Sequence, residues 1–310
     1  MFNRTLNQRN HAAKKCAAEF VRLFCVRGRI RKNLAAFVSV CVISASCQAN
    51  SQTAEQASAL THLRENALEY IKAVKNFMCI QTVTRSADNT GTGNQWKKLE
   101  VKELELNYSA NKAHYVLLKV DGKTVDMEKS IKRGYSRVGG GVEFNRVVEM
   151  IFAPEVKAEF KWDHIEQDAN KRQCVFQYKV PRETSTMTFT THTEKIVEAH
   201  HGMVYSDCES GEISRIHMVT EPSQVNVVTT NLFVKTTTQV TESSEWDVRY
   251  LRTVIGEKEI VVPQTSIVIQ HFGKTLTKSE STFRDYHKFG SEIRIVDAAE
   301  QEGTESSGPN

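Results

Sequence analysis

The pattern of hydrophobic and polar residues divides the chain into a helical beginning and a long β-rich remainder. Between about Ala54 and Asn76, apolar residues recur at steps of three and four, which is typical of a helix with one apolar face. These residues are Leu60, Leu63, Ala67, Tyr70, Ile71 and Val74. From Phe77 onward the period changes to two, and the pattern predicts strands.

Runs with a period of two and many β-forming residues predict strands over most of the chain beyond the helix. Asp121-Gly122 is a typical tight-hairpin signal. Because the intervening loops are short, neighbouring strands should be antiparallel rather than joined by βαβ crossovers. The expected strands cover residues 77–84, 96–108, 113–120, 123–127, 156–166, 172–180, 184–193, 196–206, 212–220, 225–240, 246–250, 258–271 and 274–289.

A short second helix is expected at residues 143–152, where apolar residues have helical spacing and Pro154 ends the pattern. Gly139-Gly140-Gly141 comes just before it and gives the backbone unusual freedom. The helix is therefore predicted to act as a lid. The expected fold is α+β and mainly antiparallel β, a strongly curved sheet or half-open β barrel with an N-terminal helix and a short lid helix.

Residues 1–49 have the three parts of an export signal. Residues 1–33 carry nine Lys or Arg against the single acid Glu19, and residues 34–49 carry no charge. The apolar run is shorter than the roughly 20 residues that span a bilayer, so no transmembrane span is expected in the mature chain. A signal anchor or a transit peptide is the alternative reading. The signal indicates export to the periplasm, the outer membrane or the cell surface.

Two ends of the export signal are compatible with the sequence. Cleavage after Ala49 would leave Asn50 first. Ser44-Ala45-Ser46-Cys47 also resembles a lipobox, with Cys47 as the lipidated residue, although Ser44 stands where Leu, Val or Ile is usual. Residues 50–297 are then expected to form a single β-rich domain, and residues 298–310 a disordered acidic tail.

The net positive charge of the chain comes from its leader. The whole chain has 41 basic and 37 acidic residues. Without residues 1–33, 32 basic and 36 acidic residues remain, a net charge near −4. The basic balance is therefore no argument for nucleic acid, and no nucleic-acid partner is expected.

The cysteines outside the leader are Cys79, Cys174 and Cys208. An oxidising compartment permits one disulfide among them in any of three pairings, and three buried thiols are the alternative. The sequence contains no Cys-x-x-Cys, so neither a zinc knuckle nor a redox motif is predicted.

Candidate catalytic and metal-binding residues do not form a recognisable motif. Asp163 and His164 are adjacent on an expected strand, so Asp163 should not orient the imidazole. His200 and His201 should point to opposite faces, and His192 should lie about three residues from the level of His200, so no metal site is expected. The sequence therefore predicts no enzyme activity, no metal and no cofactor.

Large apolar side chains from the short helix and the following strands are the candidates for a ligand cavity. The alternative is that they fill the core. These residues are Phe144, Met150, Phe152, Phe160, Trp162, Phe176, Tyr178, Met203 and Tyr205.

Several motifs in order resemble those of a family of uncharacterised exported bacterial proteins, across about residues 55–290. They are Asn76–Gln81, Val120–Lys123, Phe152-Ala153-Pro154, Phe160–His164, His201–Asp207 and Ser210–Ile216. The layout is in turn similar to LolA-type lipoprotein carriers and the periplasmic domain of RseB-type stress regulators. That similarity implies a half-open barrel with a helical lid over an apolar cavity that accepts acyl chains, and it transfers no individual residue.

Three classes of function follow from the sequence. The first is a non-catalytic cell-envelope module that binds a lipid or a lipoprotein acyl chain in a cavity under the lid. The second is an envelope interaction or sensor domain that binds a protein partner and no small molecule. The third is an exported hydrolase without a recognisable motif.

Overall fold

The computed structural model describes residues 34–73, 77–109, 112–126, 146–168, 171–191, 194–231 and 234–288. The chain divides into two compact units, residues 1–55 and residues 56–310. Helix α2 (Leu34–Ala73) begins in the first unit and ends in the second. The predicted N-terminal helix is confirmed, but it begins 20 residues before Ala54, because the uncharged run of residues 34–49 is also helical. No helix in the described residues is long and apolar enough to span a membrane.

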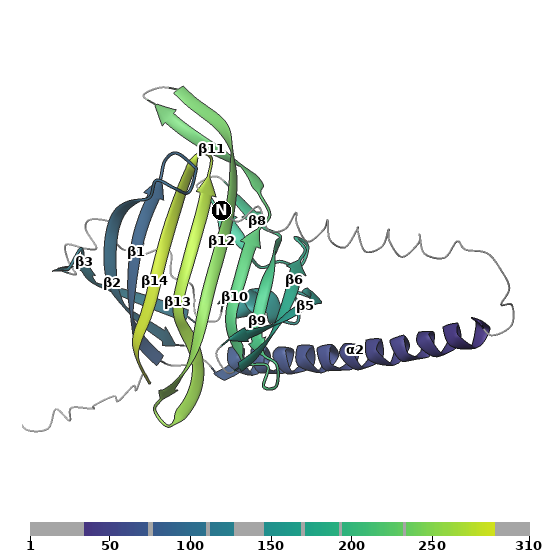
Figure 1. Cartoon of the computed structure of the whole chain (residues 1–310). Helices are drawn as coiled ribbons and strands as arrows, with labels where there is room; N and C mark the ends of the chain where they lie inside the picture. The colour runs from purple at the N-terminus through teal and green to yellow at the C-terminus, as the bar shows by residue number, and fades with distance from the viewer. Residues whose placement is uncertain are drawn as a thin grey trace, which may run out of the picture. The chain divides into compact units, whose positions relative to one another are not determined.

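The second unit consists mainly of one antiparallel sheet of 12 strands (Figure 1). Its order is β4-β3-β2-β1-β14-β13-β12-β10-β9-β6-β5, and β11 pairs with β12 beside this path. Strands β7 and β8 form a separate hairpin. The bounds are β1 Phe77–Asp88, β2 Lys97–Ser109, β3 Lys112–Val120, β4 Lys123–Thr124, β5 Glu159–Asp168, β6 Lys171–Val180, β7 Thr188–Thr190, β8 Lys195–Val197, β9 His200–Asp207, β10 Ile213–Thr220, β11 Ser223–Asn231, β12 Val234–Ile255, β13 Lys258–Phe272 and β14 Thr275–Lys288.

The sheet is neither closed nor strongly curled, so the expected half-open barrel is wrong. Strand β4 and strand β5 are the two edges of the sheet, and they do not pair with each other. Strand β4 has only two residues and offers little backbone for closure. A period of two reveals which face of each strand is buried, but it does not determine whether the outer strands meet.

One predicted strand, residues 225–240, is a hairpin in the structure. Strand β11 ends at Asn231, which pairs with Val234 at the start of β12. Strand β12 then continues for 22 residues and includes the short strand expected at 246–250. The turn was missed because no Gly or Pro interrupts the β-forming residues there.

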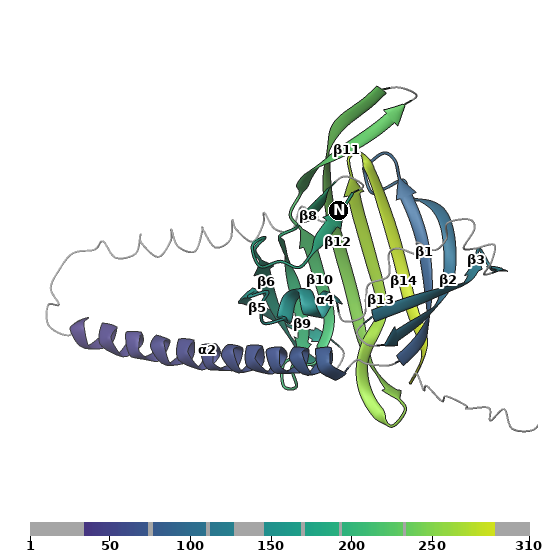
Figure 2. The same cartoon turned by 180° about the vertical axis from the view of Figure 1, so that it is seen from behind.

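One face of the sheet, called the inner face here, packs against the second helix. Figure 2 shows α4 (Arg146–Phe152) in front of β9 and β10. Its Val147, Val148, Met150, Ile151 and Phe152 are buried. They share one core with inner-face side chains and with the apolar face of α2, including Leu63 and Ala67. The opposite face of the sheet is called the outer face.

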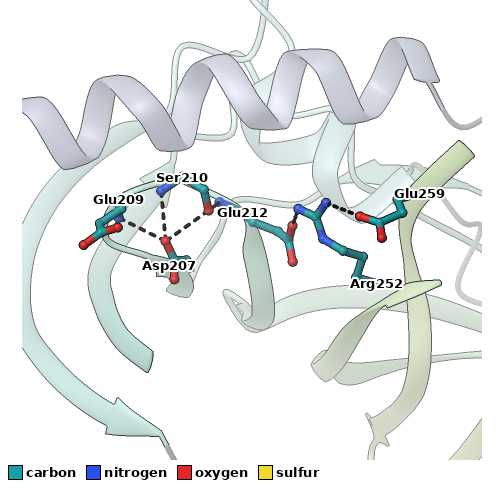
Figure 3. Close-up of polar contacts among 6 residues, drawn as sticks. All are labelled: Asp207, Glu209, Ser210, Glu212, Arg252 and Glu259. Atoms are coloured by element: carbon teal, nitrogen blue, oxygen red, sulfur yellow. Dashed lines mark hydrogen bonds and ion pairs between the residues drawn. The ribbon is translucent and has the colours of Figure 1, made fainter. Parts of the chain in front are cut away.

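The turn between β9 and β10 seats α2 on the sheet. Gly211 has φ of +72°, and a Cβ there would lie 2.2 Å from the backbone carbon of His62 in α2. Asp207 fixes the turn by accepting hydrogen bonds from the backbone N–H groups of Glu209 (3.0 Å) and Ser210 (2.9 Å), as Figure 3 shows. Only glycine therefore allows the helix to approach the turn this closely.

An ion-paired arginine connects this turn to the next hairpin of the sheet. Arg252 of β12 pairs with Glu212 and also with Glu259 of β13, the latter at 3.0 Å (Figure 3). The turn that carries Gly211 is thereby tied to the β12–β13 hairpin.

Candidate functional site

Six of the nine cavity candidates pack together on the inner face. The rings of Phe152 and Phe160 stack at 5.3 Å between centroids, and Phe160 lies 6.3 Å from Tyr178. Trp162 contacts Phe176 edge-on at 5.3 Å. Met150 belongs to the same core cluster. These residues therefore contact one another as core residues do. The remaining candidate from the expected short helix, Phe144, lies outside the described residues.

Met203 and Tyr205 lie on the outer face, away from the other candidates. In the pairing of β6 with β9, Phe176 is opposite Val204, whereas Met203 is opposite Gln177. Neighbouring residues of a strand point to opposite faces, so the side chains of Met203 and Tyr205 are directed away from the inner-face cluster. The predicted set therefore combined residues from both faces of the sheet: the β9 candidates Met203 and Tyr205 from the outer face, and the other described candidates from the inner face.

A groove of about 530 Å³ lies between α2 and α4. Leu68 and Ile71 of α2 and Met150 of α4 give it apolar walls, and Lys72 and Glu149 contribute charge. This α2–α4 groove is lined by Leu68, Ile71, Lys72, Arg146, Glu149, Met150, Ala153, Pro154, Glu155 and Thr186. Of these, the sequence had singled out only Met150 as a ligand contact. A helical pattern shows which residues face inward, but not that two helices leave a gap between them.

A second groove of about 660 Å³ crosses β5, β6, β9 and β10. It contains Met203, and its polar groups include the ion pair between Lys179 and Glu221 at 3.6 Å. This outer groove is lined by Glu159, Phe160, Lys161, Gln177, Tyr178, Lys179, His201, Gly202, Met203, His217, Val219 and Glu221.

Two carboxyl groups are buried together where β11 leaves the sheet. Glu198 and Glu242 are 0% and 1% exposed. Burial, followed by the hydrogen bond and the repulsion from Glu242, raises the pKa of Glu198 well above its ordinary value. Glu198 therefore keeps its proton at neutral pH. The pattern of the sequence does not reveal this contact, because Glu198 and Glu242 are 44 residues apart.

His200 is buried on the inner face beside α4. Burial lowers the pKa of His200 to about 4, although the carbonyl group of Met150 favours the charged ring. In a regular helix the Met150 carbonyl would accept from the N–H of residue 154, but that residue is proline and has no N–H. The neutral imidazole therefore faces a helix carbonyl that has no N–H partner four residues on.

The two adjacent histidines considered for metal binding lie on opposite faces of β9. His200 is buried and His201 is exposed, so the prediction that they point to opposite faces is confirmed. His192 and Gly139–Gly141 lie outside the described residues. No group of three or more His, Cys, Asp or Glu able to hold a metal occurs in the part of the chain that the structure describes.

Asp163 and His164 do contact each other, which corrects the sequence-based expectation. The carboxylate of Asp163 lies 2.5 Å from Nδ1 of His164. A β-bulge between Trp162 and His164 interrupts the regular alternation of β5 and turns the two side chains toward each other. Both side chains are on an edge strand, and the His164 side chain is 49% exposed.

Cys174 and Cys208 form a disulfide, one of the three pairings that the sequence allowed. It joins β6 to the turn that follows β9. Cys79 is free and buried, and burial raises the pKa of its thiol to about 12. Cys79 is therefore a protonated core residue rather than a reactive thiol.

Neither a family model nor a curated protein matches this chain.

Proposed function

We propose that the protein is a non-catalytic binding module of the bacterial cell envelope that holds a lipid or lipoprotein acyl chain in the α2–α4 groove. The observation that carries this proposal is a groove between α2 and α4 that combines apolar walls with charged side chains. Its volume of about 530 Å³ is within the usual range of ligand sites. The apolar walls suit hydrocarbon, and Lys72 suits an acidic head group.

Helix α4 is the lid in this proposal. It has seven residues and is held by side-chain packing and by the contact of His200 with its Met150 carbonyl. A helix this short is not stable by itself, so its position depends on these contacts. Movement of α4 would widen the groove while the sheet kept its strand pairing.

The leader, the disulfide and the similarity of layout support the location in the cell envelope. Residues 1–49 are proposed to direct export. The Cys174–Cys208 bond suits an oxidising compartment. The similarity to LolA-type carriers concerns acyl-chain binding, and an α2–α4 groove would serve that purpose in an open sheet, without the half-open barrel of those carriers.

Filling the groove tests the proposal. Ala153 lines the groove and is only half-buried, so Ala153→Phe should occupy the space without removing a core contact. We expect the affinity for a fluorescent fatty acid to fall at least about tenfold, with little change in melting temperature. The matched control is Leu99→Phe, which changes a side chain that is 55% exposed on β2 and lies outside the groove. Equal binding by both variants would overturn the assignment of the groove.

The packed inner face favours an envelope protein-interaction or sensor domain as the second candidate. The rings of its aromatic candidates lie 5.3–6.3 Å apart between centroids, as in a filled core. In that case the wild-type protein binds no fatty-acid probe, and Ala153→Phe has no effect on any ligand.

A further inference from the structure

Three side chains with metal-binding atoms are neighbours on the outer face where β9 pairs with β10. Met203 is directly opposite His217, and His201 is two residues before Met203 on the same face. All three line the outer groove. Directly opposite side chains have Cβ atoms about 5 Å apart, and diagonal neighbours about 7–8 Å. The two imidazoles and the thioether can therefore reach a common point above the sheet.

Neighbouring polar groups hold two of these side chains in place. Nε2 of His217 lies 2.9 Å from Oε1 of Glu245, so the neutral ring donates there and its Nδ1 keeps a free lone pair. Carboxylates commonly orient metal-binding histidines in this way. The Tyr205 hydroxyl donates to the Met203 sulfur at 3.6 Å, which leaves the sulfur a second lone pair.

We propose that His201, Met203 and His217 bind Cu(I). A thioether is a soft ligand that favours Cu(I), and imidazole is also a good copper ligand. Calcium and magnesium prefer oxygen ligands, so this set does not suit them.

The sequence did not indicate this site because one of its three ligands is a methionine, Met203, and a search among histidines does not include it. Among histidines alone, only His200 and His201 are neighbours in the sequence, and they point to opposite faces. The strand register adds His217 from β10 and the thioether from β9. This site is on the outer face and does not depend on ligand binding in the α2–α4 groove.

Silver(I), a redox-inert analogue of Cu(I), provides the test. The full chain is first treated with N-ethylmaleimide under native conditions, which blocks accessible thiols, including any in the leader. Native mass spectrometry and a competition titration then measure Ag(I) binding. We expect one Ag(I) per chain, with affinity lowered at least about tenfold by Met203→Leu and by His217→Gln. The matched control is His271→Gln on β13, which should bind like the wild type.

A fourth variant, Glu245→Gln, keeps all three ligands but weakens the orientation of His217. We expect a smaller loss of affinity than for His217→Gln, with an unchanged melting curve. His201→Gln replaces an exposed residue and gives a second ligand variant that should fold normally. If the alkylated wild-type protein binds no Ag(I), or if Met203→Leu binds Ag(I) as tightly as the wild type, the site is wrong.

Discussion

Glu198 and His200 are separated by one residue near the start of β9, and burial shifts their pKa values in opposite directions. The native state keeps Glu198 protonated above pH 4.5, where the unfolded chain has lost that proton. Between pH 6.5 and about 4 the native state keeps His200 neutral, whereas the unfolded chain binds a proton. Stability should therefore fall as the pH rises through the raised pKa of Glu198, and fall as the pH drops toward the lowered pKa of His200.

Above pH 6.5 His200 no longer contributes, so the fall in stability with rising pH reports on Glu198. Glu198→Gln should flatten this fall, which is at most about 1.4 kcal/mol per pH unit for one proton. Urea unfolding between pH 6.5 and 8.5 measures it. Glu221→Gln is the control, because the Glu221 side chain is 43% exposed. Parallel pH profiles for the wild type and Glu198→Gln would contradict the raised pKa of Glu198.

At the residue scale, the sequence predicted burial better than contacts. It identified Phe160, Trp162, Phe176 and Tyr178 as one group, because alternation along a strand can be read directly. It misjudged Asp163 and His164 because a β-bulge cannot be recognised from alternation. It could not pair Glu198 with Glu242, since their contact depends on how distant strands align.

At the element scale, the disulfide joins segments that the sheet places side by side. Cys174 and Cys208 are 34 residues apart in the sequence. A cross-link over a loop of this length restricts the unfolded chain and should stabilise the fold by about 3–4 kcal/mol. Urea unfolding of the oxidised and reduced protein measures the difference. The Cys79→Ala variant is the control against disulfide exchange, and equal midpoints in both redox states would show that the bond adds no stability.

The positions of most elements were predicted because period and turn signals are local. The strands at 172–180, 212–220 and 258–271 are each within one residue of β6, β10 and β13. The short helix, expected at 143–152, is described from Arg146 to Phe152. The β11–β12 hairpin was missed because its turn has no strong signal, and α2 was predicted too short because the apolar run was assigned to the leader alone.

At the scale of the whole molecule, the sequence predicted a mainly antiparallel β protein but not an open sheet. Its two edges are formed by the very short β4 and by β5, which carries charged residues and a bulge. Both features oppose pairing with another chain. Closure depends on the register and tilt of all strands together, and no single segment of the sequence encodes it.

Export is the prediction that concerns the whole chain. The mature protein should begin at Asn50 or, with a lipid attached, at Cys47. Intact-mass analysis of fractions from a bacterial host distinguishes these two forms from each other and from the full chain. A cytosolic protein that retains residues 1–49 would contradict the assignment of the leader.

Native mass spectrometry of protein isolated from the bacterial envelope tests ligand binding in the α2–α4 groove most directly. The account predicts that the wild type carries additional mass from a co-purified lipid, that Leu99→Phe carries the same mass, and that Ala153→Phe has lost it. Wild-type protein with the mass of the bare polypeptide, or a lipid retained equally by Ala153→Phe, would contradict it.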